Sequence, residues 1–104
     1  SVLGPWMVTK DEIEDPNNLD IECVLNGNSM QKSNTSDMIF SVARIISYLS
    51  ESATLLPGTI ILTGTPSGVG FTRKPPVYLT SGDVLETKIE KIGMLKNPVV
   101  FEEK

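Results

Sequence analysis

The segment from Leu19 to Met30 has the pattern of two strands joined by a tight turn, and it constrains the fold most strongly. Side chains alternate along it, with Leu19, Ile21, Cys23 and Leu25 on one face and Asp20, Glu22 and Val24 on the other. A period of two is typical of a strand with one buried face. Asn26-Gly27 follows directly, and Asn-Gly is the strongest short-range signal for a β-hairpin. We therefore expect a hairpin whose return strand runs through Met30.

The lone cysteine, Cys23, lies on the apolar face of this hairpin. The sequence places no cationic neighbour beside it that would lower its thiol pKa, so we interpret it as a core residue rather than a reactive thiol. A single cysteine also excludes an internal disulfide, which fits a reducing compartment.

Residues 34–51 change to a helical period. One stripe of the expected amphipathic helix contains Ile39, Val42, Ala43, Ile46 and Leu49. Thr35, Ser36 and Asp37 are all suitable N-cap residues for it. Polar residues just before a helix also present hydroxyls and N–H groups to anions, but we prefer the capping interpretation.

The second half of the chain adds turns and extended segments. We expect a turn at Pro57-Gly58, a strand from Thr59 to about Thr63, and then a glycine-rich loop. Pro75-Pro76 keeps the following backbone extended and non-helical. The remaining expected elements are a turn at 81–83, a strand through Glu90, a turn at 91–93 and a return strand from Leu95 to Phe101. One helix amid about five or six strands indicates a β-rich α+β unit.

Length and composition narrow the function classes. The 104 residues suffice for one domain at most, and the net charge of −4 argues against non-specific nucleic-acid binding. No apolar run approaches the roughly 18 to 20 residues of a membrane span. The chain has no histidine, which removes Ser-His-Asp and Cys-His catalysis and histidine metal ligands from within it.

The acidic residues Asp11, Glu12, Glu14 and Asp15 raise the question of a cation site. They lack the spacing of oxygen ligands around a fixed glycine that a Ca²⁺ loop requires. We therefore interpret this segment as a solvated turn or the start of a short helix.

The segment ILTGTPSGVG, residues 61–70, carries three glycines and a proline at the end of an expected strand. Its pattern is G-x-x-x-G-x-G, without the spacing, the following lysine or the βαβ context of nucleotide-binding loops. Thr63 and Thr65 add hydroxyls, and Arg73 and Lys74 follow a few residues later, where they are able to attract a carboxylate. From these residues alone, an anion-facing loop and a tight structural turn are equally supported.

Four segments taken in order carry a resemblance: LGPWMVTKDEIEDPNNL, NGNSMQKSNTSDMIFSVARIISYLS, LLPGTIILTGTPSGVG and RKPPVYLTSGDVLETKIEKIGMLKNPV. Together they resemble the C-terminal half of the fumarylacetoacetate hydrolase superfamily, across essentially all 104 residues. The variant GVGFTRKPPVYL is most similar to the branch that contains oxaloacetate tautomerases and related fumarylacetoacetate hydrolase domain-containing proteins.

The resemblance implies a mixed β-sheet roll around a metal-dependent site, usually in a homodimer. It also implies chemistry on small anionic 2-oxo acids or 1,3-dicarbonyls, in which Mg²⁺ or a similar cation stabilises an enolate during hydrolytic C–C cleavage, decarboxylation or tautomerisation. Residues 1–104 would then be the C-terminal portion of one catalytic domain, in the cytoplasm or the mitochondrial matrix.

The same resemblance assigns a few residues. The family's threonine that contacts the substrate carboxylate maps onto Thr65, with Gly64 beside it. Gly4-Pro5 matches a turn near the same cavity, and 34–40 matches a helix start and pocket wall. We assign no catalytic residue and no metal ligand to this chain. The family's Glu-x-Glu pair, its Asp and its Gly-Lys-Ser lysine all precede the point that corresponds to Ser1.

Two functions therefore remain in contention. The chain is either part of a metal-dependent enzyme, associated with the missing N-terminal half or with a second copy, or a non-catalytic interaction module that keeps the fold and the dimer surface. A segment bearing Glu-x-Glu discriminates between them. A small-ligand binding domain unrelated to the family is a third alternative.

Overall fold

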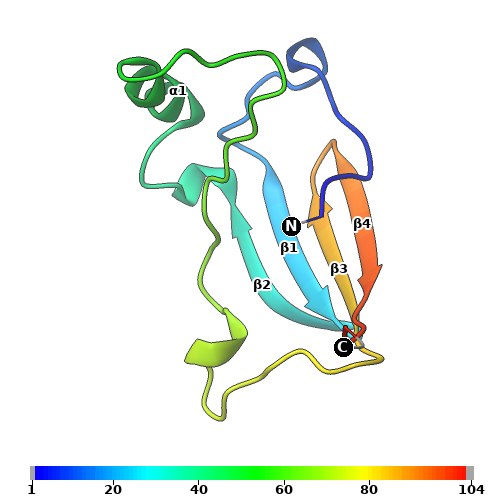
Figure 1. Cartoon of the computed structure of the whole chain (residues 1–104). Helices are drawn as coiled ribbons and strands as arrows, with labels where there is room; N and C mark the ends of the chain where they lie inside the picture. Colours follow the sequence, from blue (N-terminus) through cyan, green and yellow to red (C-terminus); the bar gives the residue numbers. More distant parts are fainter. Residues whose placement is uncertain (1, 103–104) are drawn as a thin grey trace.

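The structure, a computed structural model, describes residues 2–102 and contains one four-stranded sheet and one α-helix (Figure 1). The strands are β1 (Asp20–Leu25), β2 (Asn28–Asn34), β3 (Val84–Ile89) and β4 (Gly93–Pro98), and the helix is α1 (Val42–Ser50). Three single-turn 3₁₀ helices are η1 (Lys10–Glu12), η2 (Thr35–Asp37) and η3 (Gly70–Thr72). The sheet order is β2-β1-β3-β4, and every neighbouring pair is antiparallel. The predicted β-rich α+β class with one main helix is confirmed.

The hairpin between β1 and β2 forms as predicted. Asn26 and Gly27 both have positive φ, 48° and 81°, which a two-residue type I′ turn requires. The acidic segment near the N-terminus is also as expected, because η1 is a short exposed helical turn.

The β1–β2 ladder contains a β-bulge that the alternation does not reveal. Cys23 pairs with Gln31 and Val24 pairs with Ser29, so Met30 has no partner on β1. The prediction that Val24 faces solvent is wrong, because Val24 is only 5% exposed. Strand β1 lies between β2 and β3, so the side chains opposite Val24, those of Ser29 and Glu86, flank it on its own face of the sheet.

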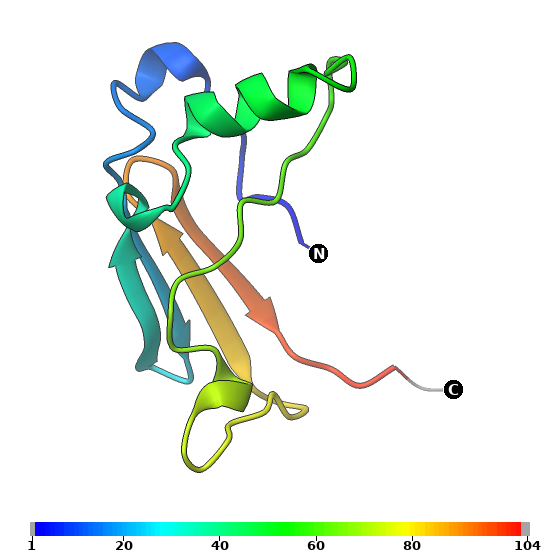
Figure 2. The ribbon, with the colours of Figure 1, turned by 90° about the vertical axis from the view of Figure 1, so that its left-hand side faces the viewer.

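The two faces of the sheet differ in charge. One face carries the ion pairs Lys88–Glu22 (3.7 Å) and Lys96–Glu86 (3.0 Å), which are solvated. The other presents uncharged residues, including Ile21, Cys23, Leu85, Thr87 and Ile89. The segment that follows α1 and the N-terminal segment lie on the same side of the sheet, and α1 lies beyond one end of the strands (Figure 2). Any site of this chain is therefore to be sought on the uncharged face.

The helix begins later than predicted. Ser41 caps it, since its Oγ accepts a hydrogen bond from the Arg44 N–H (3.3 Å). The prediction of Thr35, Ser36 and Asp37 as its caps is wrong, because these residues form η2. Extended backbone at Met38 ends that turn. Of the predicted stripe, Val42 and Leu49 are half-buried, whereas Ile39, Ala43 and Ile46 are exposed.

The predicted strand from Thr59 to Thr63 is also wrong. Its β-branched residues favour an extended backbone, but a strand needs a hydrogen-bonding partner, and no strand within residues 2–102 pairs with it. Ile60 and Leu62 remain 59% and 76% exposed.

Burial within the described residues is sparse. Only Leu19, Val24 and Leu25 are buried among the apolar side chains of 2–102, whereas eighteen large ones are exposed. The radius of gyration is 15.6 Å, compared with about 13 Å for a compact domain of roughly 100 residues. Many large apolar side chains therefore lack cover by other residues within 2–102. In that range no helix has the length and apolar composition needed to cross a bilayer.

Asp83 joins the hairpin turn to the start of β3. Its Oδ1 accepts from Asn26 Nδ2 (2.8 Å), and its Oδ2 accepts from the N–H (2.8 Å) and the hydroxyl (3.2 Å) of Thr80. The Thr80 N–H and then the Asn26 side chain lower the pKa of the Asp83 carboxyl from its usual value.

We expect these hydrogen bonds of Asp83 to stabilise the fold less in acid. A carboxyl whose folded-state pKa is lowered contributes stability above its unfolded pKa of about 3.9, and loses it as the pH falls through the folded value. Asp83→Asn should therefore reduce stability at pH 7 and have much less effect near pH 3, as measured by urea unfolding. An equal effect of the substitution at both pH values would contradict this account.

Candidate substrate-binding cleft

A cleft of about 930 Å³ lies over the uncharged face of the sheet. Its floor comes from β1 and β3, one wall from η2 and the residues up to Phe40, and the opposite wall from Thr63 to Ser67. The polar side chains in its lining are Gln31, Ser33, Asn34, Thr35, Asp37, Thr63, Thr65, Ser67 and Thr87. Gly64 and Thr65, for which the sequence predicts substrate contacts, thus both border a cavity. Their contact with substrate stays a prediction.

The wall that carries Thr65 is fastened to strand β2 by one side chain. The Gln31 Nε2 donates to Thr65 Oγ1 (2.8 Å) and to the Pro66 carbonyl oxygen (2.6 Å). Gln31 stands next to the β-bulge, on the same face as Cys23. No sequence motif marks Gln31 as functional, and its only signal is its place in the return strand of the hairpin.

A second fastening involves the bulge itself. The carbonyl oxygen of Met30, which has no partner on β1, accepts a hydrogen bond from the Arg73 guanidinium. The Nε of Arg73 also donates to the Gly68 carbonyl oxygen (3.1 Å). Arg73 therefore holds the loop to the sheet, and it is not among the residues that line the cleft.

The main chain of the loop keeps donors available. Gly64 has φ of +93° and is exposed, and a Cβ built on it would meet no atom within 4 Å. Among residues 2–102, no backbone carbonyl accepts from the N–H groups of Gly64, Thr65, Ser67 and Gly68. N–H groups that lack protein acceptors at the edge of a cleft are suited to an anionic ligand.

The charges of the cleft do not suit a bound cation. Asp37 is the one charged side chain in the lining, and its Oδ2 already accepts a hydrogen bond from Ser33 Oγ (2.5 Å). Within the described range 2–102, no group of three or more His, Cys, Asp or Glu side chains converges. A hard cation such as Mg²⁺ takes several oxygen ligands. The residues present therefore do not form its site on their own.

Cys23 lies in the floor of the cleft and is half-buried. Burial raises the pKa of its thiol. The thiol therefore stays protonated at neutral pH, which agrees with a packing role.

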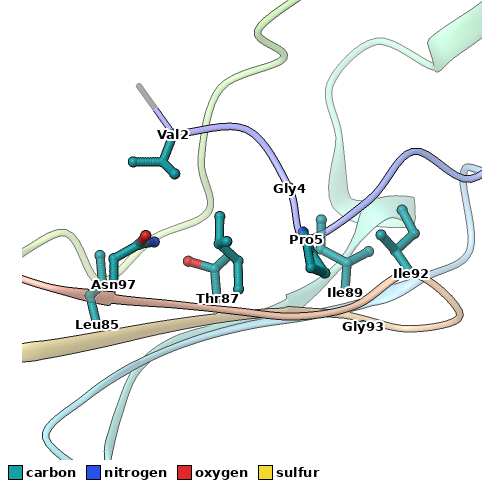
Figure 3. Close-up of a pocket in the computed structure, with 10 residues that line it drawn as sticks. Val2, Gly4, Pro5, Leu85, Thr87, Ile89, Ile92, Gly93 and Asn97 are labelled. Atoms are coloured by element: carbon teal, nitrogen blue, oxygen red, sulfur yellow. The ribbon is translucent and has the colours of Figure 1, made fainter.

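A smaller depression of about 340 Å³ adjoins the cleft across β3. Figure 3 shows Val2 and Pro5 above it, with Leu85, Thr87 and Ile89 rising from the sheet beneath. The same three β3 residues also form part of the floor of the larger cleft. Gly4-Pro5 thus lies next to the cavity that Thr65 borders.

Comparison with known proteins identifies the family. Residues 1–100 match the family model described as "Fumarylacetoacetate (FAA) hydrolase C-terminal". Over 98 residues the chain is 52% identical to "Oxaloacetate tautomerase fahd2, mitochondrial" of Xenopus laevis, covering 94% of this chain and 31% of that protein. It is also 52% identical to the 2,4-didehydro-3-deoxy-L-rhamnonate hydrolase of Sphingomonas sp. (strain SKA58), covering 93% of this chain and 34% of that enzyme. The chain thus spans about a third of the length of these relatives.

Solved structures agree with this assignment. A putative HpcE protein from Mycobacterium smegmatis superposes with a TM-score of 0.90 at 45% identity, covering 94% of this chain and 36% of that one. Maleylpyruvate hydrolase from Sphingobium sp. SYK-6, in complex with manganese(II) and pyruvate, superposes with a TM-score of 0.83 at 39% identity, covering 93% and 34%. The sequence match, the α+β fold and these superpositions lead to one conclusion: the chain belongs to the fumarylacetoacetate hydrolase family.

Proposed function

We propose that this chain is the C-terminal portion of a single catalytic domain that acts on small 2-oxo acids or 1,3-dicarbonyls. The reaction is C–C hydrolysis, decarboxylation or keto–enol tautomerisation. The observation that carries the proposal is the place of Gly64 and Thr65 at the wall of a large cleft over the uncharged face of the sheet. Relatives named as a tautomerase and as hydrolases support tautomerisation and hydrolysis within this range.

The chain's own residues bind and orient the substrate. The Thr65 hydroxyl and the neighbouring N–H groups donate to the substrate carboxylate, each hydrogen bond to a charged group contributing about 1.5–3 kcal/mol. The apolar floor, with Ile21, Leu85 and Ile89, lowers the dielectric beneath the bound acid and strengthens these hydrogen bonds.

The counter-charge comes from outside this chain. The cleft lining contains neither Lys nor Arg, and it contains one Asp. A bound 2-oxo acid thus meets hydrogen-bond donors here but no positive charge. We place the divalent cation of the complete enzyme, Mg²⁺ or a similar ion, on residues that this chain does not supply.

This placement predicts weak cation binding. The isolated chain should bind Mg²⁺ no more tightly than about 1 mM, because its carboxylates do not converge. Isothermal titration calorimetry measures this directly. Tight uptake of one Mg²⁺ per chain would show that a site exists within these residues.

The remainder of the domain also covers apolar surface. The unpaired segment 59–63 and the exposed side chains of Ile39, Phe40 and Ile46 lie outside any core formed by 2–102. In the proposal, the N-terminal half of the domain packs on this surface, and two complete copies form a homodimer.

The test is an assay of the complete protein with oxaloacetate and with an acylpyruvate, each with Mg²⁺ or Mn²⁺ and after EDTA treatment. We expect metal-dependent turnover of at least one of these acids. A folded complete protein that turns over neither acid would support the non-catalytic interaction module instead.

A further inference from the structure

The β-bulge in β2 lies next to Gln31, which contacts Thr65, one of the two loop residues that we assign to substrate. Because Met30 has no partner on β1, the strand shifts its register directly before Gln31. The Gln31 side chain spans to a loop 34 residues later in the chain and meets Thr65 and Pro66 there. This contact bears on the direction of the Thr65 hydroxyl as well as on the position of the loop.

The orientation of the Gln31 carboxamide follows from Pro66. The Pro66 carbonyl oxygen, 2.6 Å from Nε2, can only accept a hydrogen bond, so the carboxamide must present its NH₂ group. The same NH₂ group lies 2.8 Å from Thr65 Oγ1. The two N–H bonds thus reach two acceptors, and the Thr65 oxygen accepts rather than donates in this contact.

The Thr65 hydroxyl proton is left for another acceptor. Among residues 2–102, no acceptor for this proton is present, and Thr65 is exposed at the wall of the cleft. We propose that Gln31 is a positioning residue: it occupies the acceptor side of the Thr65 hydroxyl, so that its proton points to a carboxylate in the cleft. This inference rests on the proposed function.

The polarity of the contact gives a specific test with two substitutions. In Gln31→Glu the carboxylate has no proton to donate, so it accepts the Thr65 hydroxyl proton and removes the donor from the cleft. In Gln31→Leu the Thr65 hydroxyl loses the hydrogen bond from residue 31, but its proton can still be donated to a ligand in the cleft. Dissociation constants for pyruvate are measured by calorimetry on the complete metal-loaded protein. KM and kcat are measured with the 2-oxo acid that the protein turns over. Both Gln31 substitutions are made in the wild-type and in the Thr65→Val backgrounds.

We expect Gln31→Glu to weaken pyruvate binding about 10- to 100-fold, and Gln31→Leu only about 2- to 5-fold, with kcat changed less than KM. In the Thr65→Val background, the weakening of pyruvate binding by Gln31→Glu should be severalfold smaller, because residue 65 then has no hydroxyl proton for the carboxylate to accept. Thermal unfolding shows whether each variant is folded. If Gln31→Glu fails to fold, the smaller fold-change in pyruvate binding caused by Gln31→Leu is measured in both backgrounds instead. That fold-change should also be smaller in the Thr65→Val background.

The outcomes separate the inference from the proposed function. Equal Gln31→Glu factors in both backgrounds would show that charge repulsion alone acts, and would overturn the positioning role. Wild-type protein that neither binds pyruvate nor turns over a 2-oxo acid would overturn the proposed function and this inference with it.

Discussion

Replacing Gly68 with Ala should lower the free energy of unfolding of the complete protein by about 2–5 kcal/mol and reduce kcat/KM. Gly68 has φ of +102°, where a Cβ costs about 1–2 kcal/mol. A Cβ there would also overlap the Met30 carbonyl oxygen, and such overpacking adds about 1–3 kcal/mol. Because the loop approaches the bulge this closely, the added methyl group pushes it off β2 and moves Thr65 with it.

Gly58→Ala is the matched control for Gly68→Ala. Gly58 has a similar φ of +89°, but a Cβ on it would meet no atom within 4 Å. This substitution should therefore show only the backbone cost of about 1–2 kcal/mol. Urea unfolding of both variants separates the two effects. Equal losses would mean that the loop does not dock on Met30 as described.

Replacing Thr65 with Val should lower kcat/KM about 5- to 150-fold, which corresponds to about 1–3 kcal/mol of lost transition-state binding. Valine has nearly the shape of threonine but cannot donate a hydrogen bond to the substrate carboxylate. Folding should be nearly unaffected, because Thr65 is exposed and Gln31 keeps its hydrogen bond to Pro66.

Thr65→Ser is the control for this substitution, since it keeps the hydroxyl and should retain most activity. Steady-state kinetics with oxaloacetate or an acylpyruvate measure both variants. Unchanged kinetics in Thr65→Val would remove Thr65 from the substrate site.

Local signals predicted much of the fold. The hairpin at Asn26-Gly27 and the turn at Gly82 were predictable because a tight turn depends on a few adjacent residues. The α+β class followed from the change of period after Asn34. The helix start was misplaced by a few residues because several capping residues precede it, and only Ser41 has the geometry of a cap.

Long-range pairing was not predictable from the same signals. The hydrogen bond from Arg73 to Met30 and the contact between Gln31 and Thr65 each join residues more than thirty positions apart. The bulge at Met30 lies within the hairpin, but the regular alternation of side chains does not reveal it. The strand predicted for 59–63 failed for a related reason. Composition favours an extended backbone, but whether a strand forms depends on which segment lies beside it.

The candidate site was predicted by resemblance rather than by residue pattern. The pattern of residues 61–70 left open whether the loop faces an anion or is a tight turn. The structure places Gly64 and Thr65 at a cleft. It also shows that Arg73 joins the loop to the sheet through its hydrogen bonds to Gly68 and Met30. The geometry that gives the Thr65 hydroxyl a direction depends on the β2 bulge, which the sequence pattern does not encode locally.

The central claim is that this chain binds the carboxylate of the acid, while residues outside it coordinate the metal ion. A crystal structure of the complete protein with pyruvate and Mn²⁺ tests this claim most directly. The account predicts Thr65 Oγ within about 3 Å of a pyruvate carboxylate oxygen, and no side chain of residues 1–104 among the metal ligands. Pyruvate bound away from Gly64 and Thr65, or Mn²⁺ held by a carboxylate of this chain, would contradict it.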